Sequence, residues 1–379
     1  MSLLSQLSPF VGNENIVSLL IAMLWLFMMM IFFVYPTFGQ RMQLSYMLRD
    51  IEKKLNRIKI IKDDIRQRTI DTVKNVGKPE QDPTQEIDRL SEFFLIPPES
   101  MDPFGIVYKL EHILEVHESA FENDVKKLAP HAEEHQVKTL TNLVEINRGI
   151  NTLYRVVRHF YLLGKKTANI YLVLQLQMIM PMLMEIAEAY RRASVAFAEG
   201  QPIGDGIGVL VAAKLANGNE KRRYEIAKDT IVQEVEIESR RVLIVRALGP
   251  GGTVGRPGEG VRRLIEQEKE KPELIVTIDA GLKLEGEETG KIVEGVGVAI
   301  GGPGIDKFKI EEVAKQYNIP LYAFVIFESI GEAITPMKES IAKAADNVMR
   351  KVRQILLERV KEGGTAIIAG IGNTVGIGT

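Results

Sequence analysis

The sequence predicts a single N-terminal transmembrane helix, then an all-α domain and a C-terminal α/β domain with a mostly parallel, doubly wound sheet. Three observations predict this fold class. An uncharged apolar run occupies residues 15–35, helical patterns dominate residues 84–200, and short apolar runs alternate with helices from residue 201 onward. Continuous apolar strands separated by helices are typical of a parallel sheet covered on both faces.

Composition sets the outer limits. The 379 residues are enough for two domains besides the anchor. The net charge of −2 shows no basic excess, so we expect no nucleic-acid partner. The absence of cysteine excludes disulfides, thiolate metal sites and cysteine nucleophiles.

We expect residues 14–36 to form the transmembrane helix and residues 1–13 an extracytoplasmic tail. No charged side chain lies between Glu14 and Arg41, and residues 15–35 would make a helix about 30 Å long, the thickness of the hydrocarbon core. A cleaved signal peptide fits less well, because the N-terminus has no Lys or Arg and no small-residue cleavage site follows the run. Residues 41–76 carry ten basic residues against five acidic ones. The positive-inside rule then places the N-terminus outside the cell membrane and the body in the cytoplasm.

A second uncharged run, residues 167–184, is long enough to be considered as a membrane span. It contains Asn169, Gln175, Gln177 and Pro181, and basic residues flank it on both sides. Since polar interruptions are costly in lipid, we interpret this run as a buried helix of the soluble body.

Residues 37–77 form a basic juxtamembrane segment. Apolar residues recur there at alternating spacings of four and three. They are Leu44, Leu48, Ile51, Leu55, Ile58 and Ile65. The pattern fits two structures equally: an amphipathic helix lying on its own domain, or a short coiled coil that joins subunits into a homo-oligomer. In either case its basic face would meet anionic membrane lipid.

Residues 84–200 are expected to be a helical domain, with helices at residues 86–94, 106–116 and 138–163 and an ordered turn at residues 97–105. The α/β domain follows over residues 201–379. Its expected strands are residues 230–237, 241–248, 274–279, 296–300, 321–327 and 365–369. Its expected helices are residues 258–268, 306–317 and 332–362.

Glycine-rich loops follow several of these strands, at the edge where sheets of this kind bind ligands. Glycines let the backbone approach a ligand closely, and amides at a helix N-terminus bind anions. The residues predicted to bind a ligand are Gly251, Gly252, Thr253, Gly255, Arg256, Asp279, Gly281, Gly301, Gly302, Gly304 and Glu328. A phosphorylated small molecule fits the glycines and Arg256, and Asp279 and Glu328 could hold a divalent metal or a ribose hydroxyl.

Two further patterns have weaker support. Residues 204–208 contain three glycines and are interpreted as an interdomain hinge rather than a second anion site. His131 and His135 fit the H-x-x-E-H order of zinc peptidases, but their surroundings are polar where such a catalytic helix should be half buried. We therefore predict no metal site there.

The sequence as a whole resembles a known family. The resemblance rests on the apolar anchor, on residues 93–112 and 279–304, and on the ending Gly-Ile-Gly-Asn-Thr-Val-Gly at residues 370–376. These are similar to an archaeal family of membrane proteins known only as a domain of unknown function. The resemblance implies an archaeal origin and no activity, so it assigns no catalytic residue and no cofactor.

Two functions remain open from the sequence. In the first, a membrane-tethered, self-associating protein binds a phosphorylated small molecule or nucleotide in its α/β domain, as a sensor or an enzyme. In the second, the chain is a structural scaffold, an anchored homo-oligomeric ring or array, and the glycine loops serve only as turns.

Overall fold

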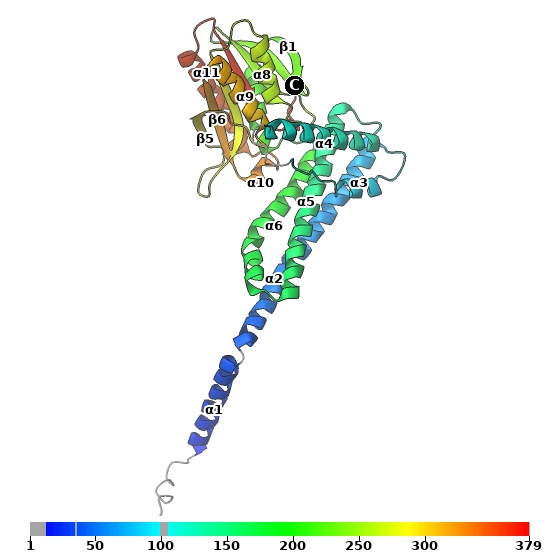
Figure 1. Ribbon diagram of the computed structural model, residues 1–379, viewed down its shortest axis with the longest axis vertical. Coiled ribbons are helices and arrows are strands. Elements are labelled where there is room, and N and C mark those ends of the chain that lie inside the picture. The colour runs from blue at the N-terminus through cyan, green and yellow to red at the C-terminus, as the bar shows by residue number, and fades with distance from the viewer. Residues whose placement is uncertain (1–12, 35, 99–104, 379) are drawn as a thin grey trace, which may run out of the picture. The chain divides into compact units, whose positions relative to one another are not determined.

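The computed structural model describes residues 13–34, 36–98 and 105–378 (Figure 1). The tail expected at residues 1–13 lies almost wholly outside the described residues, as does most of the turn expected at residues 97–105. Contacts divide the chain into two compact units, Met1–Arg57 with Arg155–Met182, and Ile58–Tyr154 with Leu183–Thr379. The helices expected to form a separate domain therefore contribute to both units, and those of the second unit pack with the α/β fold.

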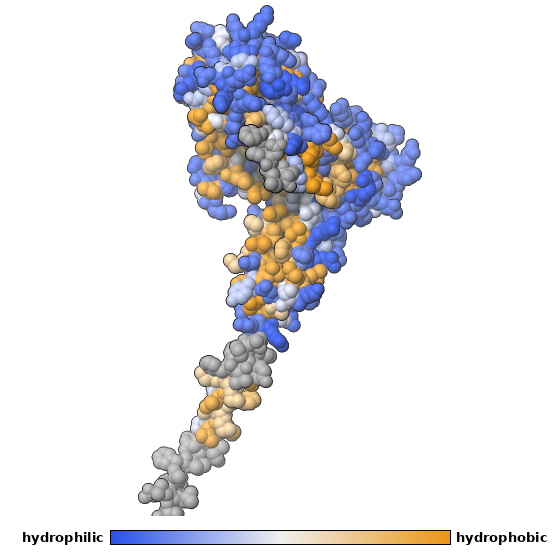
Figure 2. Space-filling view, in the orientation of Figure 1, coloured by the Kyte–Doolittle hydropathy of each residue, from blue (hydrophilic) through white to orange (hydrophobic). Residues whose placement is uncertain are grey.

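The first unit contains helix α1 (Asn13–Val34) and one end each of α2 (Pro36–Thr72), α5 (Glu134–Thr167) and α6 (Ile170–Glu199). Apart from Ser18, the described side chains of α1 are apolar, and they are exposed, as Figure 2 shows; Trp25, for example, is 62% exposed. Among the described residues, α6 is the helix that is long and apolar enough to cross a membrane, and Val17–Ile31 is a shorter apolar stretch. The N-terminal membrane span therefore stays a prediction.

The expectation of a buried helix at residues 167–184 is wrong for the first half of α6. Tyr171 is 76% exposed and Met178 is 72% exposed. The absence of charged residues marks these positions as apolar, but it does not say whether other parts of the chain cover them. The exposed side chains give this helix a large apolar surface in the first unit.

The apolar seam of α2 is covered within the single chain. Ile51, Ile58 and Ile65 are fully buried. This burial favours the helix that lies on its own domain over a coiled coil between subunits, because these side chains are not available to a second copy.

The second unit also contains the π-helical turn η2 (Val73–Gly77) and helices α3 (Thr84–Leu90) and α4 (Ile106–Leu128). The α/β region then begins with the 3₁₀ turn η3 (Gly204–Gly206) and helix α7 (Ile207–Ala216). Its seven strands are β1 (Glu220–Ala227), β2 (Thr230–Ile237), β3 (Arg240–Ala247), β4 (Leu274–Leu282), β5 (Ile292–Val296), β6 (Leu321–Glu328) and β7 (Thr365–Gly370). The remaining helices are α8 (Pro257–Gln267), α9 (Ile305–Tyr317), α10 (Ile330–Ala333) and α11 (Glu339–Arg359).

The strands form one mixed sheet in the order β1-β2-β3-β7-β4-β6-β5. The four central strands β3, β7, β4 and β6 are parallel, whereas β1, β2 and β5 pair antiparallel. The prediction of a mostly parallel sheet is thus wrong, because the strands at both edges of the sheet are antiparallel. A hairpin joins β2 to β3, and β5 returns along β6 at the other edge.

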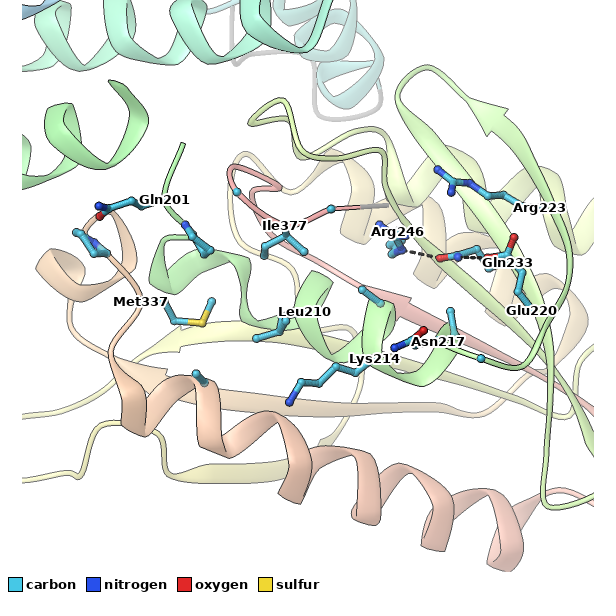
Figure 3. Close-up of a pocket in the computed structure, with 18 residues that line it drawn as sticks. Gln201, Leu210, Lys214, Asn217, Glu220, Arg223, Gln233, Arg246, Met337 and Ile377 are labelled. Atoms are coloured by element: carbon cyan, nitrogen blue, oxygen red, sulfur yellow. Dashed lines mark hydrogen bonds between the residues drawn. The ribbon is translucent and has the colours of Figure 1, made fainter. Parts of the chain in front are cut away.

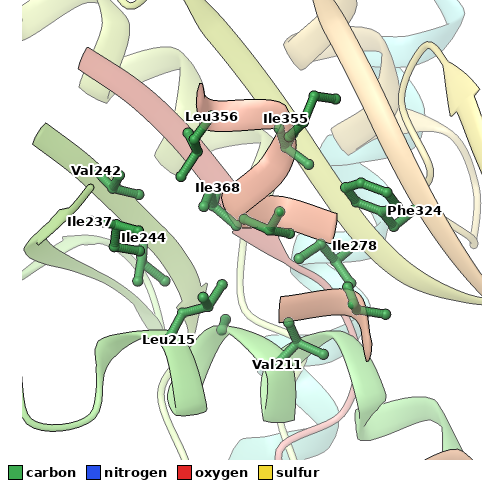
Figure 4. Close-up of a cluster of buried hydrophobic side chains, with 14 of the residues drawn as sticks. Val211, Leu215, Ile237, Val242, Ile244, Ile278, Phe324, Ile355, Leu356 and Ile368 are labelled. Atoms are coloured by element: carbon green, nitrogen blue, oxygen red, sulfur yellow. The ribbon is translucent and has the colours of Figure 1, made fainter. Parts of the chain in front are cut away.

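Helices cover both faces of this sheet, which explains why its central strands are continuous apolar runs. On one face, α7 and α11 pack on alternate residues such as Val242, Ile244 and Ile278 (Figure 4). On the other, α8 and α9 pack on the intervening residues such as Leu243 and Val245. Each of these strands therefore contributes side chains to the hydrophobic core on both faces of the sheet.

Three elements differ from the expectation. The strand expected at residues 296–300 is wrong beyond Val296, because β5 occupies Ile292–Val296 instead. The following segment crosses back over β4, where the Ala299 amide donates to Thr277 Oγ1 at 2.9 Å. Strand β1 is missing from the prediction because its charged sequence, Glu-Lys-Arg-Arg, belongs to an exposed edge. The helix expected at residues 332–362 begins at Glu339, after the short helix α10.

Candidate functional site

The carboxyl ends of β3, β7, β4 and β6 lie along one edge of the sheet, because these four strands are parallel. This edge brings together the loop of residues 248–256, the segment of residues 371–378, Asp279 and Glu328. The sequence-predicted ligand residues on these segments therefore share one region. Whether they bind a ligand stays a prediction.

The glycine loop after β3 already uses several of its backbone amides. The Thr253 amide donates to Thr374 Oγ1 at 3.0 Å, and the Gly255 amide donates to Thr253 Oγ1 at 3.0 Å. The Arg256 amide donates to Thr230 Oγ1 at 2.6 Å. These three amides are not free to bind a phosphate. The glycines at positions 252 and 255 have φ of +66° and +67°, so the turn itself requires them.

A cavity of about 480 Å³ lies beside this loop, between Gly252–Arg256 and helices α4 and α5. Four cations line it, and each is already paired with a carboxylate. The pairs are Lys138 with Asp229, Arg148 with Glu145, Lys228 with Glu122, and Arg256 with Glu118. The cavity is therefore close to charge-balanced, and an anion entering it would have to displace existing ion pairs.

The other predicted glycines have mainly structural roles. The Gly301 amide donates to Asp279 Oδ2 at 3.0 Å, so the structure brings these two predicted residues together. Gly302 and Gly304 have φ of +83° and +87° with open space around them, and Gly304 precedes α9. Gly281 lies against the Val325 side chain on the neighbouring strand. Of the predicted glycines in the described structure, Gly301, Gly302 and Gly304 have open space beside them.

Three carboxylates meet behind this edge. Asp279 lies three residues before the end of β4, Glu328 ends β6, and Asp205 lies in the turn η3 that precedes α7. Glu328 is 1% exposed, and neither of its carboxylate oxygens has a hydrogen-bond partner among the described residues. A Cβ added at Gly204 would collide with Glu328 Oε2, which shows how closely η3 covers this carboxylate.

Burial raises the pKa of all three carboxyl groups, and repulsion adds to the effect at Asp279 and Glu328. Burial raises the pKa of Asp279 to about 8, and the negative charge of Asp205 adds to the effect. Burial also raises the pKa of Glu328 to about 8, with added repulsion from Asp205, Glu332 and Asp279. These carboxyl groups offer no positive charge to an anion, so the structure adds no support to a second anion site at residues 204–208, the alternative to the expected hinge. The described residues also contain no group of three such side chains placed to bind a metal ion.

His131 and His135 do not converge on a metal site either. His135 lies 3.3 Å from the Glu133 carboxylate, and its side chain is 46% exposed. In the described part of the chain, the two histidines belong to no group of three His, Asp or Glu side chains that could hold a metal ion. That the H-x-x-E-H order is accidental stays a prediction.

A larger cavity, of about 800 Å³, lies elsewhere, beside α7 and strands β1 to β3 (Figure 3). Arg246 of β3 faces it while being only 1% exposed. Its Nε donates to Gln233 Oε1 at 2.6 Å, and Gln233 is in turn held by Glu220. Among the described residues, Arg246 has no carboxylate partner. Burial, with a smaller contribution from Arg223, lowers the pKa of Arg246 to about 10, so the guanidinium stays charged at neutral pH.

A second cation adds positive charge to the cavity that Arg246 faces. Arg223 of β1 lines the same cavity, and the described structure gives its side chain no hydrogen bond or ion pair. Lys214 of α7 also lines it but is paired with Asp346 at 2.7 Å. Glu220 is the one carboxylate that lines the cavity in the described structure. The lining is therefore net positive, and its remaining walls are largely apolar, with Leu210 and Met337 among them.

The sequence contained one signal for this cavity. Arg246 interrupts the apolar run Val-Leu-Ile-Val-Arg-Ala of β3, and its alternation places it on the same face as Val242 and Ile244. An arginine on an inward face of a central strand needs a partner or a ligand. The predicted ligand residues do not include Arg246, because glycine-rich loops mark the ends of strands and Arg246 lies within β3.

Fold and cavities together define a class: a helical region joined to an α/β domain with small-molecule-sized cavities, on a chain that carries long apolar helices. The chain belongs to the DUF1512 family. Residues 25–200 match the N-terminal domain described as a protein of unknown function, and residues 203–378 match the C-terminal domain of unknown function. A comparison with curated proteins gave no match. The expected domain of unknown function is thus confirmed, while archaeal origin and membrane anchoring stay predictions.

Proposed function

We propose that this chain is a membrane-tethered, self-associating protein whose α/β domain binds a phosphorylated small molecule or nucleotide, with the anion held by Arg246. The observation that carries the proposal is a buried guanidinium that faces a cavity without a carboxylate partner among the described residues. Burying an unpaired charge is costly, and a bound anion would remove that cost.

The chemistry of the cavity favours phosphate over other anions. A guanidinium offers paired N–H groups that match two phosphate oxygens. Within the described structure, Arg246 donates its hydrogen bonds through Nε and Nη1. Arg223 provides a second positive charge at the same cavity. The volume of about 800 Å³ lies within the range of small-molecule sites, and apolar walls suit the carbon skeleton or base of the ligand.

The experiment is thermal unfolding of the full-length protein in detergent, with inorganic phosphate, glucose 6-phosphate and ATP as probes. A ligand present at about a hundred times its Kd stabilises the folded state by about 2.7 kcal/mol. For a cooperative unit of this size, that corresponds to a rise in Tm of roughly 5–10 °C.

The deciding variant is Arg246→Met, with Arg222→Met as its matched control. Arg222 lies on β1, where its guanidinium rests over the Tyr224 ring, and it does not line the cavity. We expect Arg246→Met to weaken binding by about tenfold to a hundredfold, the loss of charge-assisted hydrogen bonds, while Arg222→Met binds normally. An unchanged response in Arg246→Met, or no response to any probe in the unaltered protein, would refute the proposal.

The tether is supported by the exposed apolar side chains of α1 and by the basic segment that follows it. Deleting residues 1–38 should move the protein from the membrane pellet to the soluble fraction after alkaline washing. If the shortened chain stays in the pellet, the membrane anchor is α6, since this helix is long and apolar enough to cross a membrane.

Self-association, and the alternative of a scaffold, are supported by the apolar surface where α5 ends and α6 begins. Phe160, Tyr171 and Met178 are each at least 40% exposed. Contiguous apolar surface of this kind is typical of contacts with lipid or with another chain. Native mass spectrometry from gentle detergent distinguishes these cases: a discrete oligomer without any ligand adduct favours the scaffold, and a monomer contradicts both self-associating functions.

A further inference from the structure

The inference concerns the class of molecule that fits the cavity of about 800 Å³, and it rests on the proposed phosphate site at Arg246. The side chains that line this cavity fall into a charged group and an apolar group on different elements. The charged group lies on the adjacent strands β1 to β3. Arg223 and Gln233 are partners in the pairing of β1 with β2, and Gln233 accepts a hydrogen bond from Arg246. The positive charge is therefore gathered at one side of the cavity.

The apolar group comes from other elements. Leu210 and Ala213 lie on α7, Met337 lies just before α11, and Ile377 lies near the C-terminus. Leu210 and Met337 are partly buried and pack against the hydrophobic core beneath them. In Figure 3 the side chains of Met337, Leu210 and Ile377 lie on the opposite side of the view from Arg223 and Gln233. The cavity thus has a charged side and an apolar side.

The polar side chains near the apolar side already have partners. Lys214 of α7 pairs with Asp346 of α11 at 2.7 Å. Gln201 Nε2 donates to Glu199 Oε2 at 2.7 Å. A sugar carries several hydroxyl groups that each need a hydrogen-bond partner when they leave water. This side of the cavity therefore favours a hydrocarbon over a sugar.

The lining also lacks the groups that usually recognise a nucleotide. None of the described residues that line the cavity is aromatic, so no ring is placed to stack on a base. Glu220 is the one carboxylate in the described lining, and it already accepts a hydrogen bond from Gln233. A carboxylate that binds ribose hydroxyls would need its acceptor positions for the ligand.

We propose that the ligand is a phosphate monoester of an apolar alcohol, an amphiphile whose phosphate is bound by Arg246 and Arg223. Its hydrocarbon chain lies against Leu210 and Met337. Methionine is unbranched and adapts its shape, which suits contact with a flexible chain. Such amphiphiles partition into lipid, where a membrane-tethered protein would meet them.

The test is isothermal titration of the full-length protein with ethyl phosphate, hexyl phosphate, ribose 5-phosphate and hexanol. The protein is held in amphipol, because detergent micelles would take up the hydrocarbon chains of the probes. Each buried methylene tightens binding by about fourfold, equivalent to about 0.8 kcal/mol. We expect hexyl phosphate to bind about a hundredfold tighter than ethyl phosphate, allowing for incomplete burial of its four extra methylenes. Ribose 5-phosphate should bind no tighter than ethyl phosphate, and hexanol more weakly than hexyl phosphate.

Two variants test the apolar side. Met337→Gln and Leu210→Gln should each weaken hexyl phosphate binding by about tenfold, because an amide would replace an apolar contact with the chain. Neither should change the affinity for ethyl phosphate. The matched control is Met349→Gln: Met349 is also partly buried against the same core, but it does not line the cavity. The two variants lie on separate elements, so the test stays decisive if one of them fails to fold.

The outcomes separate this inference from the proposed phosphate site. Equal affinity for ethyl and hexyl phosphate, tighter binding of ribose 5-phosphate, or full hexyl phosphate binding in both glutamine variants would overturn the amphiphile. If Arg246→Met still abolished binding of the phosphates in those cases, the proposed function would stand. Hexanol binding as tight as that of hexyl phosphate, or no binding of any phosphate probe, would overturn both.

Discussion

Replacing Glu328 with glutamine should change how the stability of the protein depends on pH. Glu328 is 1% exposed and its oxygens have no hydrogen-bond partner among the described residues, so its negative charge is unfavourable in the folded state. Its pKa rises from an ordinary 4.5 to about 8. Since glutamine keeps the shape of the side chain but cannot ionise, Glu328→Gln removes this one titration.

The sign and size of this pH dependence of the free energy of unfolding follow from proton linkage. The folded state holds a proton on Glu328 that the unfolded chain releases near pH 4.5. The stability from this proton is complete below about pH 4.5 and is lost as the pH rises towards about 8. Each pH unit in that window lowers the free energy of unfolding by about 1.4 kcal/mol, so the loss from pH 5 to pH 7 is roughly 3 kcal/mol.

The assay is differential scanning calorimetry of the full-length protein in detergent between pH 5 and pH 8. The unaltered protein should lose roughly 5–10 °C in Tm over two pH units from Glu328 alone, whereas Glu328→Gln should have a clearly flatter curve. Because Asp279 repels Glu328, the variant should also lower the pKa of Asp279 and flatten the curve further. Parallel curves of Tm against pH for the two proteins would refute this reasoning. The control is Glu339→Gln: Glu339 is exposed and pairs with Lys343, so the Tm of this variant should follow that of the unaltered protein.

The remaining predictions concern packing and polar burial. Gly204→Ala should lower the free energy of unfolding by roughly 2–4 kcal/mol, because its Cβ would collide with Glu328 Oε2 and with the Glu332 carbonyl oxygen; chemical denaturation measures this, and a neutral result would contradict the close packing of η3. Asn147→Ala should cost about 1–2 kcal/mol, since buried Asn147 Nδ2 donates to Ser91 Oγ at 2.6 Å; equal midpoints for variant and parent would argue against that bond. Without ligand, Arg246→Met should be no less stable than the parent, because it removes a buried unpaired charge; a large drop in Tm would mean that the guanidinium has a partner in the ligand-free protein.

The sequence by itself determined most of the secondary structure and the fold class in outline. Central strands such as β3 and β4 were predictable because both faces are covered by helices and nearly every residue must therefore be apolar. The same reasoning placed Asp279 and the glycine loops at one edge, since parallel strands all end on the same side. Periodicity also located α8 and α9 to within a residue or two.

Only the tertiary structure decided the features that depend on distant parts of the chain. The direction of β5 and the existence of β1 follow from pairing partners and not from local pattern, and an edge strand such as β1 carries no apolar alternation that would reveal it. The first half of α6 is apolar, yet its exposure depends on what packs against it.

The sites show the same division. Thr374 and Thr230 occupy the amides of the glycine loop from other segments, so the loop that looks open in sequence is already bonded in space. Conversely, Arg246 forms no ion pair in the described fold, although acidic residues are frequent along the chain and Glu220 lines the same cavity. Whether a charge is paired is a property of three-dimensional distance, because an ion pair forms over a few ångströms regardless of separation in sequence. The sequence therefore determined which chemical groups are present, and the fold determined which of them lack a partner.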